Sequence, residues 1–236
     1  SMALRCRLMA ATCWEGCEVS TLDNNQLQDN RRDFKFARLR RESLDASPFA
    51  QFSQWMDDAL QAQLVDPTAM TLATVGEGGR PWQRMVLLKG FDRQGFIFYT
   101  NLGSRKAAEI AANPHVSLQF PWLALDRQVM VGGRAEKLSV TEVVKYFLKR
   151  PMQSRLAAWA SRQSSRINSR QALETQYLQL KEKYADGEVP VPDFWGGFRV
   201  VPHEFEFWQG GEHRLHDRFN YTLDESQQWQ ISRLAP

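Results

Sequence analysis

Residues 84–106 read RMVLLKGFDRQGFIFYTNLGSRK and contain the clearest structural pattern of the chain. Two segments rich in β-branched, aromatic and other apolar side chains, residues 85–91 and 96–100, flank a short sequence with the composition of a turn. A loop follows, and residues 105–112 are good helix formers. The pattern therefore predicts a β-hairpin that leads directly into a helix.

The predicted helix begins with two cations. Ser104 is the expected N-cap, so Arg105 and Lys106 fall in the first helical turn. Free backbone N–H groups and the helix dipole favour an anion at this end, and cations placed beside them indicate a bound phosphate. A solvated pair of surface charges fits the same pattern, and the helix start alone does not decide between the two interpretations.

An earlier helix is predicted from Ser47-Pro48, which supplies an N-cap and a proline at the first helical position. Asp66-Pro67 follows its end. The apolar residues spaced for one buried face are Phe49, Phe52, Trp55, Met56, Ala59 and Leu60.

Strands are predicted at residues 69–75 and 82–91, joined by a glycine-rich turn, so an antiparallel meander is expected. Arg84 and Lys89 are an odd number of residues apart and would point to opposite faces of a regular strand. Both can bind one ligand only if a bulge intervenes or if the ligand spans a sheet edge or a subunit boundary.

Two further strands are predicted at residues 115–122 and 128–137. Ser139 and Glu142 then form the sequence of a capping box, which opens a helix through Lys149.

Tyr146 and Arg150 stand four residues apart on one face of that helix, just before Pro151. A phenol and a guanidinium so placed fit a phosphate clamp and fit a surface pair equally well. Another amphipathic helix is predicted over residues 169–184. Its packing residues are Leu173, Tyr177, Leu180 and Tyr184.

Residues 212–221 carry an unusual density of cations. If this run is extended, Arg214, His216 and Arg218 share one face, and apolar residues occupy the other. Such a strand belongs beside an anionic ligand. The alternative is a solvated edge strand with protective charges, although edges more often use lysine.

Composition limits the classes of function. The 236 residues carry a net charge of only +3, too little for a general nucleic-acid binder. No apolar run is long enough to span a membrane, and the start lacks the apolar core of a secretory signal, so a cytoplasmic protein is expected.

The cysteines, Cys6, Cys13 and Cys17, lie far from every histidine, so we expect neither a metal site nor a disulfide framework. Residues 1–28 are expected to be a disordered extension, followed by one domain over residues 29–236.

The sequence shows no nucleophile–base pair, metal set or carboxylate dyad. Its cations and aromatic side chains suit phosphates and planar rings. A protein of this kind is expected to position a cofactor that performs the chemistry.

From about Arg31 to Pro236 the chain resembles the pyridoxine/pyridoxamine 5′-phosphate oxidase family. The resemblance rests on the motifs RMVLLK, FYTNLGSRK, RQVMV, KRP, SRQSSRI, FWGGF, FWQGGEHRLHDRF and RLAP, in this order. It implies an α+β, mainly β fold, a split β-barrel with peripheral helices, which forms a homodimer with FMN at the subunit interface.

The resemblance also implies roles for residues at matching positions. The implied FMN contacts are Arg84, Met85, Val86, Leu87, Leu88, Lys89, Tyr99, Thr100, Arg105, Lys106, Gln128, Gln163, Ser164, Trp208 and Arg218. The implied substrate contacts are Lys89, Tyr146, Arg150, Ser154, Arg214, Leu215 and His216. Among these, Tyr146, Arg150 and Ser154 would bind the substrate phosphate, and Arg214 and His216 would be the catalytic pair facing the pyridine ring.

The implied reaction is oxidation of pyridoxine or pyridoxamine 5′-phosphate to pyridoxal 5′-phosphate by hydride transfer to FMN, with oxygen reduced to hydrogen peroxide. The alternatives are another FMN split-barrel oxidoreductase and a non-enzymatic carrier of pyridoxal phosphate.

Two departures from the family pattern stand out. Asp33-Phe34 replaces a common Glu-Tyr, and Arg155 adds a positive charge beside Ser154. The basic arm of residues 31–34 and 38–41 is either solvated or a flap over an anionic ligand, and residues 38–41 are also a candidate for a second, regulatory phosphate site.

Overall fold

The computed structural model describes residue 34, residues 38–161 and residues 163–236. The extension expected at residues 1–28 and the departure at Asp33 fall outside the described residues. Lys35–Pro236 forms one compact unit. The domain boundary at residue 29 stays a prediction.

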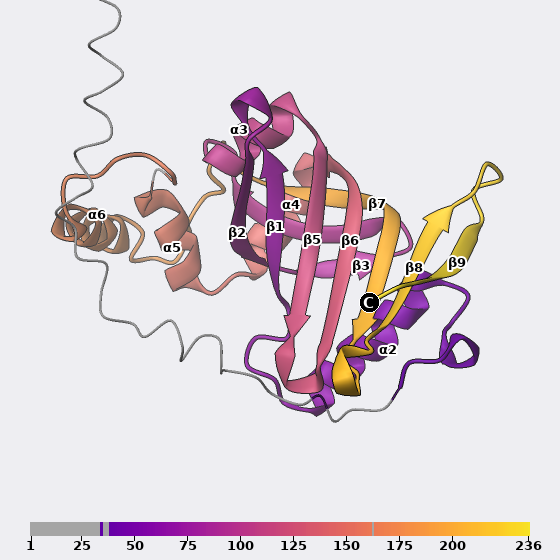
Figure 1. Cartoon of the computed structure of the whole chain (residues 1–236). Helices are drawn as coiled ribbons and strands as arrows, with labels where there is room; N and C mark the ends of the chain where they lie inside the picture. Colours follow the sequence, from indigo (N-terminus) through magenta and orange to yellow (C-terminus); the bar gives the residue numbers. More distant parts are fainter. Residues whose placement is uncertain (1–33, 35–37, 162) are drawn as a thin grey trace, which may run out of the picture. The chain divides into compact units, whose positions relative to one another are not determined.

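Within the described residues, nine strands pair in antiparallel fashion to form one open sheet (Figure 1). The strands are β1 Ala69–Val75, β2 Pro81–Leu87, β3 Gly90–Asp92, β4 Gly95–Asn101, β5 His115–Trp122, β6 Arg127–Lys137, β7 Trp195–Gln209, β8 Asp217–Leu223 and β9 Trp229–Leu234. Strand β6 pairs along almost the whole of β7. The other edge of β7 pairs first with β4 and then with β8. The predicted class, α+β and mainly β, is confirmed.

The helices surround this sheet. They are α2 Pro48–Gln61, α3 Arg105–Ala112, α4 Val140–Lys149, α5 Met152–Ala160 and α6 Arg170–Lys183, with short 3-10 turns η1 Arg41–Ser43, η2 Glu77–Gly79, η3 Leu123–Leu125 and η4 Glu212–Arg214. The predicted caps are in place, since Ser47 accepts from the Ala50 N–H and Ser139 forms a capping box with Glu142. Helix α5 and strand β9 lie in segments for which the sequence pattern predicted no element.

The main core lies between α2 and the sheet. Phe52 is fully buried, and its ring meets the rings of Phe91, Phe96 and Phe120 edge-on, each at a centroid distance of 4.9 Å. Leu60, predicted on the buried face of α2, is instead 52% exposed, because it lies in the last turn of the helix.

A smaller cluster joins the end of α4 to α5 and α6. It is built on Phe147, Leu156 and Val189, and Tyr177, Leu180 and Tyr184 of α6 pack against it as predicted.

The predicted strand at residues 82–91 is interrupted. Strand β2 ends at Leu87 and pairs with β1, whereas the hairpin with β4 is made by β3 alone. The Leu88 N–H donates to the Thr68 carbonyl and the Lys89 N–H to the Ile97 carbonyl, so the chain changes partner between these two residues.

The predicted extended run at residues 212–221 is also wrong in its first half. Residues His213 and Arg214 have φ of 53° and 63°, and the turn is closed by the Gly211 N–H, which donates to His216 Nδ1 at 3.1 Å. A Cβ on Gly211 would lie 2.2 Å from the Leu215 carbonyl oxygen, so the turn requires glycine there. Because β8 begins at Asp217, Arg214 does not share a strand face with Arg218.

Candidate active site

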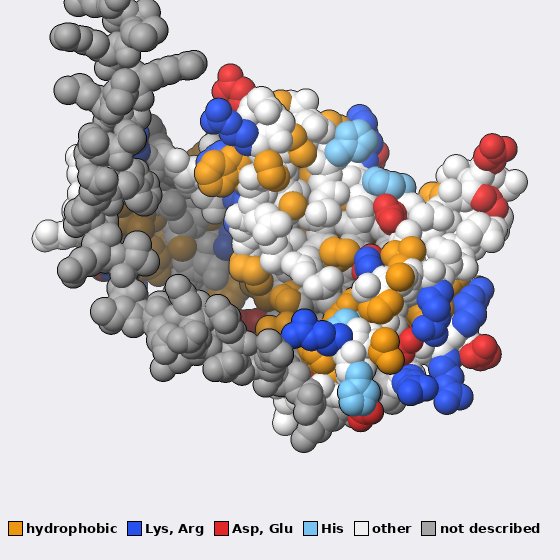
Figure 2. Space-filling view, in the orientation of Figure 1, with side chains coloured by type: hydrophobic (Ala, Val, Ile, Leu, Met, Phe, Trp, Pro, Cys, Tyr) orange, Lys and Arg blue, Asp and Glu red, His pale blue; other side chains and the backbone are white. Residues whose placement is uncertain are grey.

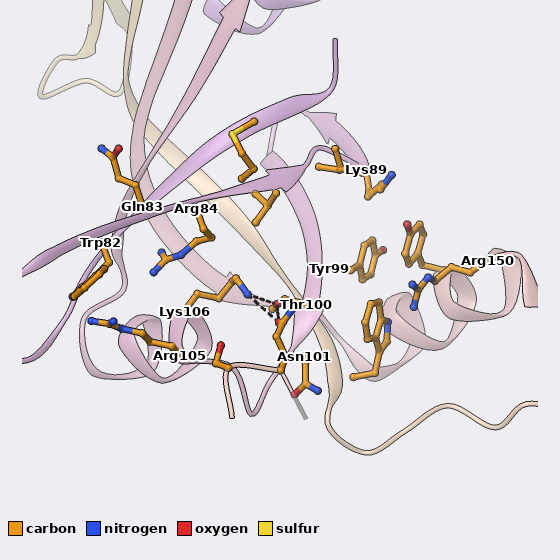
Figure 3. A pocket seen from close by; sticks show the side chains of 17 residues that line it. Trp82, Gln83, Arg84, Lys89, Tyr99, Thr100, Asn101, Arg105, Lys106 and Arg150 are labelled. Atoms are coloured by element: carbon orange, nitrogen blue, oxygen red, sulfur yellow. Dashed lines mark hydrogen bonds between the residues drawn. The ribbon is translucent and has the colours of Figure 1, made fainter. Parts of the chain in front are cut away.

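A cavity of about 610 Å³ opens between β2, β4, the start of α3 and the end of α4. Its lining residues are Trp82, Gln83, Arg84, Met85, Val86, Leu87, Lys89, Tyr99, Thr100, Asn101, Arg105, Lys106, Tyr146, Arg150, Gln163, Ser164 and Trp195. Most of the residues implied to bind FMN or substrate phosphate are therefore brought together here. Figure 3 shows two groups in this cavity, with Arg84, Arg105 and Lys106 on one side and Lys89, Tyr99 and Arg150 on the other.

The break between β2 and β3 explains how Arg84 and Lys89 reach one cavity. On a regular strand their side chains would diverge, but the chain leaves β1 after Leu87 and joins β4 at Lys89. Both side chains then line the same space within a single chain. The subunit boundary considered from the sequence is not needed to bring these two residues together.

The first group is organised by a buried carboxylate, Glu109 of α3, which is 8% exposed. Arg84 Nη2 donates to Glu109 Oε2 at 2.9 Å, and Arg105 Nε donates to Oε1 at 2.7 Å. The Thr74 hydroxyl also donates to this carboxylate. Burial raises the pKa of Glu109, but the hydrogen bonds from Thr74, Arg105 and Arg84 outweigh it and hold the pKa below its usual value.

Sequence analysis missed Glu109. One signal was present, because Glu109 follows Arg105 by four residues and such a pair meets on a helix surface. Its contact with Arg84 depends on the packing of α3 against β1 and β2, which the local sequence does not encode.

Lys106 lies in the same group and is 8% exposed. Its Nζ donates to Thr100 Oγ1 at 3.1 Å, to Gln163 Oε1 at 3.0 Å and to Ser104 Oγ at 3.4 Å. All three acceptors are neutral. Burial and the positive charge of Arg84 lower the pKa of Lys106, against the opposing effect of Glu109. A buried ammonium with only neutral acceptors is a site suited to an anion.

The second group is held by aromatic rings. Tyr99 and Tyr146 stack with a centroid distance of 3.7 Å and an interplanar angle of 7°. The Arg150 guanidinium carbon lies 4.2 Å from the centroid of the Trp195 ring. Arg150 Nη1 is buried without a hydrogen-bond partner, and no carboxylate among the described residues lies within ion-pair distance of Arg150. Burial lowers the pKa of Arg150, with Tyr146 opposing this shift.

Several residues with implied roles do not line the cavity. Leu88 is in the core, at 5% exposure. Ser154 is half-buried on α5, four residues after Arg150 in the sequence, with Arg155 next to it. The possible regulatory site at residues 38–41 stays a prediction.

The remaining residues form a separate set, here called the C-terminal group. Its members are Gln128, Trp208, Arg214, Leu215, His216 and Arg218. Gln128, Trp208 and Arg218 are direct neighbours across β6, β7 and β8, so their side chains share one face of the sheet. The Trp208 and His216 rings lie 4.7 Å apart, and Arg218 forms an ion pair with Glu206 at 2.9 Å.

The C-terminal group and the cavity lie near opposite ends of β7. Trp195 lines the cavity at the start of this strand and Trp208 lies near its end. A strand of this length covers roughly 45 Å along its path. The two sets are therefore well separated along the path of this strand.

The edge beside the cavity is apolar and exposed. Trp82, Met85 and Leu87 on β2 are 43%, 58% and 45% exposed, and β2 is an end strand of the sheet. Figure 2 shows hydrophobic side chains at the surface over this part of the sheet. Exposed apolar patches of this kind mark an interaction surface.

Two other features bear on function. No cluster of His, Cys, Asp or Glu in the described residues is placed to hold a metal ion. None of the described helices is long and apolar enough to cross a membrane.

The family profile described as "Pyridoxamine 5′-phosphate oxidase" matches residues 56–184. A second profile, "Pyridoxine 5′-phosphate oxidase C-terminal dimerisation region", matches residues 195–236. Similar curated proteins include the pyridoxine/pyridoxamine 5′-phosphate oxidases of Photobacterium profundum and Escherichia fergusonii. The first is 59% identical over 89% of this chain and 99% of its own length. The second is 57% identical over 91% of this chain and 99% of its own length.

Solved structures agree with the fold. PhzG from Burkholderia lata, in complex with tetrahydrophenazine-1-carboxylic acid, is 29% identical, with a TM-score of 0.80 over 87% of this chain and 100% of its own. An FMN-binding protein from Nostoc punctiforme, related to pyridoxamine 5′-phosphate oxidase, has a TM-score of 0.63 over 82% of this chain and 100% of its own; at 18% identity it supports the fold alone. The predicted split-barrel fold is thereby confirmed.

Proposed function

The chain belongs to the pyridoxamine 5′-phosphate oxidase family, and on this premise we propose how its residues act. It is an FMN-dependent enzyme of vitamin B6 metabolism that oxidises pyridoxine and pyridoxamine 5′-phosphate to pyridoxal 5′-phosphate. We infer that the functional unit is a homodimer and that oxygen is the final electron acceptor. The family's dimerisation region, matched at residues 195–236, supports the dimer.

The first group of the cavity, organised by Glu109, is the proposed site for the FMN phosphate. Arg84 and Arg105 pair with one carboxylate and Lys106 lies in the same group, which leaves an excess of two positive charges. A phosphate monoester carries roughly 1.5 to 2 negative charges at neutral pH, so the charges match. The start of α3 adds backbone N–H groups. The buried Lys106 ammonium, bonded only to neutral oxygens, is the observation that supports the fit of this group to the residues present.

The second group of the cavity, which contains Arg150, is the proposed site for the substrate phosphate. The guanidinium has no carboxylate to neutralise it among the described residues, and Tyr146 lies in the last turn of α4, which Arg150 caps. Lys89 lies on this side of the cavity as well (Figure 3). A phosphate bound here places the substrate ring inside the cavity and away from the FMN phosphate.

The C-terminal group of a second copy completes the site in this proposal. Trp208, Gln128 and Arg218 share one sheet face and offer a planar surface with polar neighbours to the flavin. Arg214 and His216 would face the pyridine ring, orient it and hold a proton near the reacting carbon. When bound, FMN supplies the acceptor for the hydride that leaves this carbon. The separation of the two sets along β7 is the single observation that carries the two-subunit proposal.

The function is tested by oxygen-dependent turnover. Protein loaded with FMN is mixed with pyridoxine 5′-phosphate, and both pyridoxal phosphate absorbance and hydrogen peroxide are followed. The proposal predicts equal amounts of both products. Binding of pyridoxal phosphate without peroxide would favour a carrier, and turnover only with a nicotinamide would favour another FMN oxidoreductase of this fold.

A further inference from the structure

Arg150 differs from the other two arginines of the cavity in having no carboxylate partner among the described residues. Arg105 also lies over an aromatic ring, that of Trp82 at 3.5 Å, but it is paired with Glu109. The Arg150 guanidinium carbon lies 4.2 Å from the Trp195 ring centroid and 5.7 Å from that of Phe147. Its Nη1 is buried and has no hydrogen-bond acceptor. The position of this charge therefore depends on aromatic faces rather than on an oppositely charged side chain.

Trp195 is itself fixed by the sheet. It is the first residue of β7, is opposite Asn101 of β4 in register, and donates its backbone N–H to the Pro192 carbonyl at 3.0 Å. Its ring also meets Phe147 at a centroid distance of 5.8 Å. The indole Nε1 is buried without a partner, so no hydrogen bond among the described residues accounts for tryptophan at this position.

The choice of an aromatic partner has a chemical consequence. A carboxylate would order the guanidinium but would also neutralise it and compete with a phosphate for its N–H groups. An aromatic face attracts the cation from the side and leaves the charge and the in-plane donors available for a ligand. A partner of this kind suits a site that must bind a doubly charged anion reversibly.

We propose that Trp195 is a positioning residue for the substrate phosphate: its ring orders the Arg150 guanidinium while leaving that charge free to bind the anion. This inference rests on the proposed function, because it takes Arg150 as a phosphate ligand. It adds a residue to which neither the sequence motifs nor the family resemblance gives a role.

The test compares Trp195→Leu with Trp195→Phe in the FMN-loaded enzyme. Trp195→Leu raises KM for pyridoxine 5′-phosphate about five- to thirtyfold, which corresponds to the usual strength of a partly buried cation–π contact. The inhibition constant of inorganic phosphate rises by a similar factor. The kcat and the FMN dissociation constant change less than about twofold, since Trp195 acts before the chemical step. Trp195→Phe keeps an aromatic face and recovers most of the lost affinity.

Trp159→Leu is the matched control. Trp159 packs against the same small cluster, donates its indole N–H to Pro190 and meets Phe194. The described rings that lie under Arg150 are those of Trp195 and Phe147, not that of Trp159. Loss of Trp159 is expected to lower stability and leave KM unchanged. An equal rise in KM in this variant would show that loosened packing, not the cation–π contact, causes the effect, and would overturn the proposal.

A double-mutant cycle separates the two residues. In an Arg150→Ala background, Trp195→Leu should raise KM no further, because the cation it positions is gone. Fully additive effects contradict the proposal, as does an unchanged KM in Trp195→Leu alone. A wild-type enzyme that binds FMN but never oxidises pyridoxine 5′-phosphate would instead refute the proposed function.

Discussion

The two cationic sides of the cavity differ in whether a carboxylate pairs with the arginine. Each side also has a cation–π contact, Arg105 over Trp82 at 3.5 Å and Arg150 over Trp195 at 4.2 Å. On one side a buried carboxylate, Glu109, holds Arg84 and Arg105 through ion pairs of 2.9 and 2.7 Å. On the other side two aromatic rings hold Arg150, and no carboxylate of the described chain pairs with it. The first arrangement pairs both arginines with a carboxylate and leaves only Lys106 with neutral acceptors, whereas the second leaves its arginine without a carboxylate.

The difference in arginine partners indicates which ligand each side of the cavity suits. A carboxylate that links α3 to β2 ties the phosphate ligands to the folded structure, so the cofactor side is expected to be ordered before FMN binds. The aromatic side gives up electrostatic stabilisation to keep its affinity for an anion. The carboxylate-linked side suits a cofactor that stays bound, and the aromatic side suits a substrate that must leave as product.

The largest expected effect is on stability. Glu109→Ala should lower the free energy of unfolding of the FMN-free protein by about 2–3 kcal/mol, because Arg84 loses its partner in a partly buried site. Denaturant unfolding at fixed protein concentration measures it. Glu174→Ala is the control, since its ion pair with Arg170 is exposed on α6. An equal loss of unfolding free energy in the two variants would show that the Glu109 ion pairs stabilise the fold no more than an exposed pair.

Next comes the substrate side. Arg150→Ala should raise KM for pyridoxine 5′-phosphate roughly 10- to 100-fold, the usual loss for hydrogen bonds to a charged group. Because Arg150 is assigned to the substrate alone, FMN affinity should stay within about twofold. Steady-state kinetics and flavin fluorescence titration give the two values. A matching loss of FMN affinity would mean that the two sides are not separate sites.

A smaller effect is expected from pH. The pKa of Lys106 lies below 10.5, so its charge is lost earlier than that of an exposed lysine as the pH rises. FMN affinity should therefore fall about tenfold through this lowered pKa, as one charge-assisted hydrogen bond is lost. FMN titrations from pH 7 to 10 with wild type and Lys106→Met measure the change.

In the FMN-free protein, folding stability responds to pH in the opposite direction from FMN affinity. The folded-state pKa is depressed, so protonated Lys106 costs stability at lower pH, and this cost disappears as the pH rises toward the unfolded-state value. The stability difference between wild type and Lys106→Met should therefore shift in favour of the wild type with rising pH. A pH-independent difference in both measurements would contradict the assigned burial of the charge.

The smallest effect concerns the helix that carries the substrate side. Ser139→Ala removes the capping box of α4 and should cost about 1 kcal/mol of stability. KM should change less than about twofold, because Arg150 is held by Trp195 and not by the helix start. Thermal unfolding checks the loss of stability, and steady-state kinetics on the same preparation check the KM. A large rise in KM would indicate that α4 as a whole, and not Trp195, sets the position of Arg150.

Regular elements with strong local signals were predictable from the sequence. Strands β1 and β5 have the predicted boundaries, and α4 begins at its capping box. The break after Leu87 was not predictable, since it is set by the distant carbonyls of Thr68 and Ile97.

The same contrast applies to the site. Part of the site is local, since Arg105 meets Glu109 four residues further on and Lys106 meets Thr100 six residues back. The aromatic side is not, because Tyr146 stacks on Tyr99 and Arg150 lies over Trp195. Glu109 escaped notice because its main partner, Arg84, lies on another element. Three residues of the C-terminal group are neighbours across three strands, but in the two-subunit proposal their place in the site depends on a second copy, which no local pattern encodes.

Mixed dimers test the two-subunit site most directly. Arg150→Ala disables the cavity and Arg214→Leu disables the C-terminal group, and each variant alone should turn over poorly. After the two are unfolded and refolded together in equal amounts, about a quarter of wild-type activity should appear, because half of the dimers are mixed and each mixed dimer holds one intact site. A mixture no more active than its separate parents would show that each chain forms its site alone, contrary to this account.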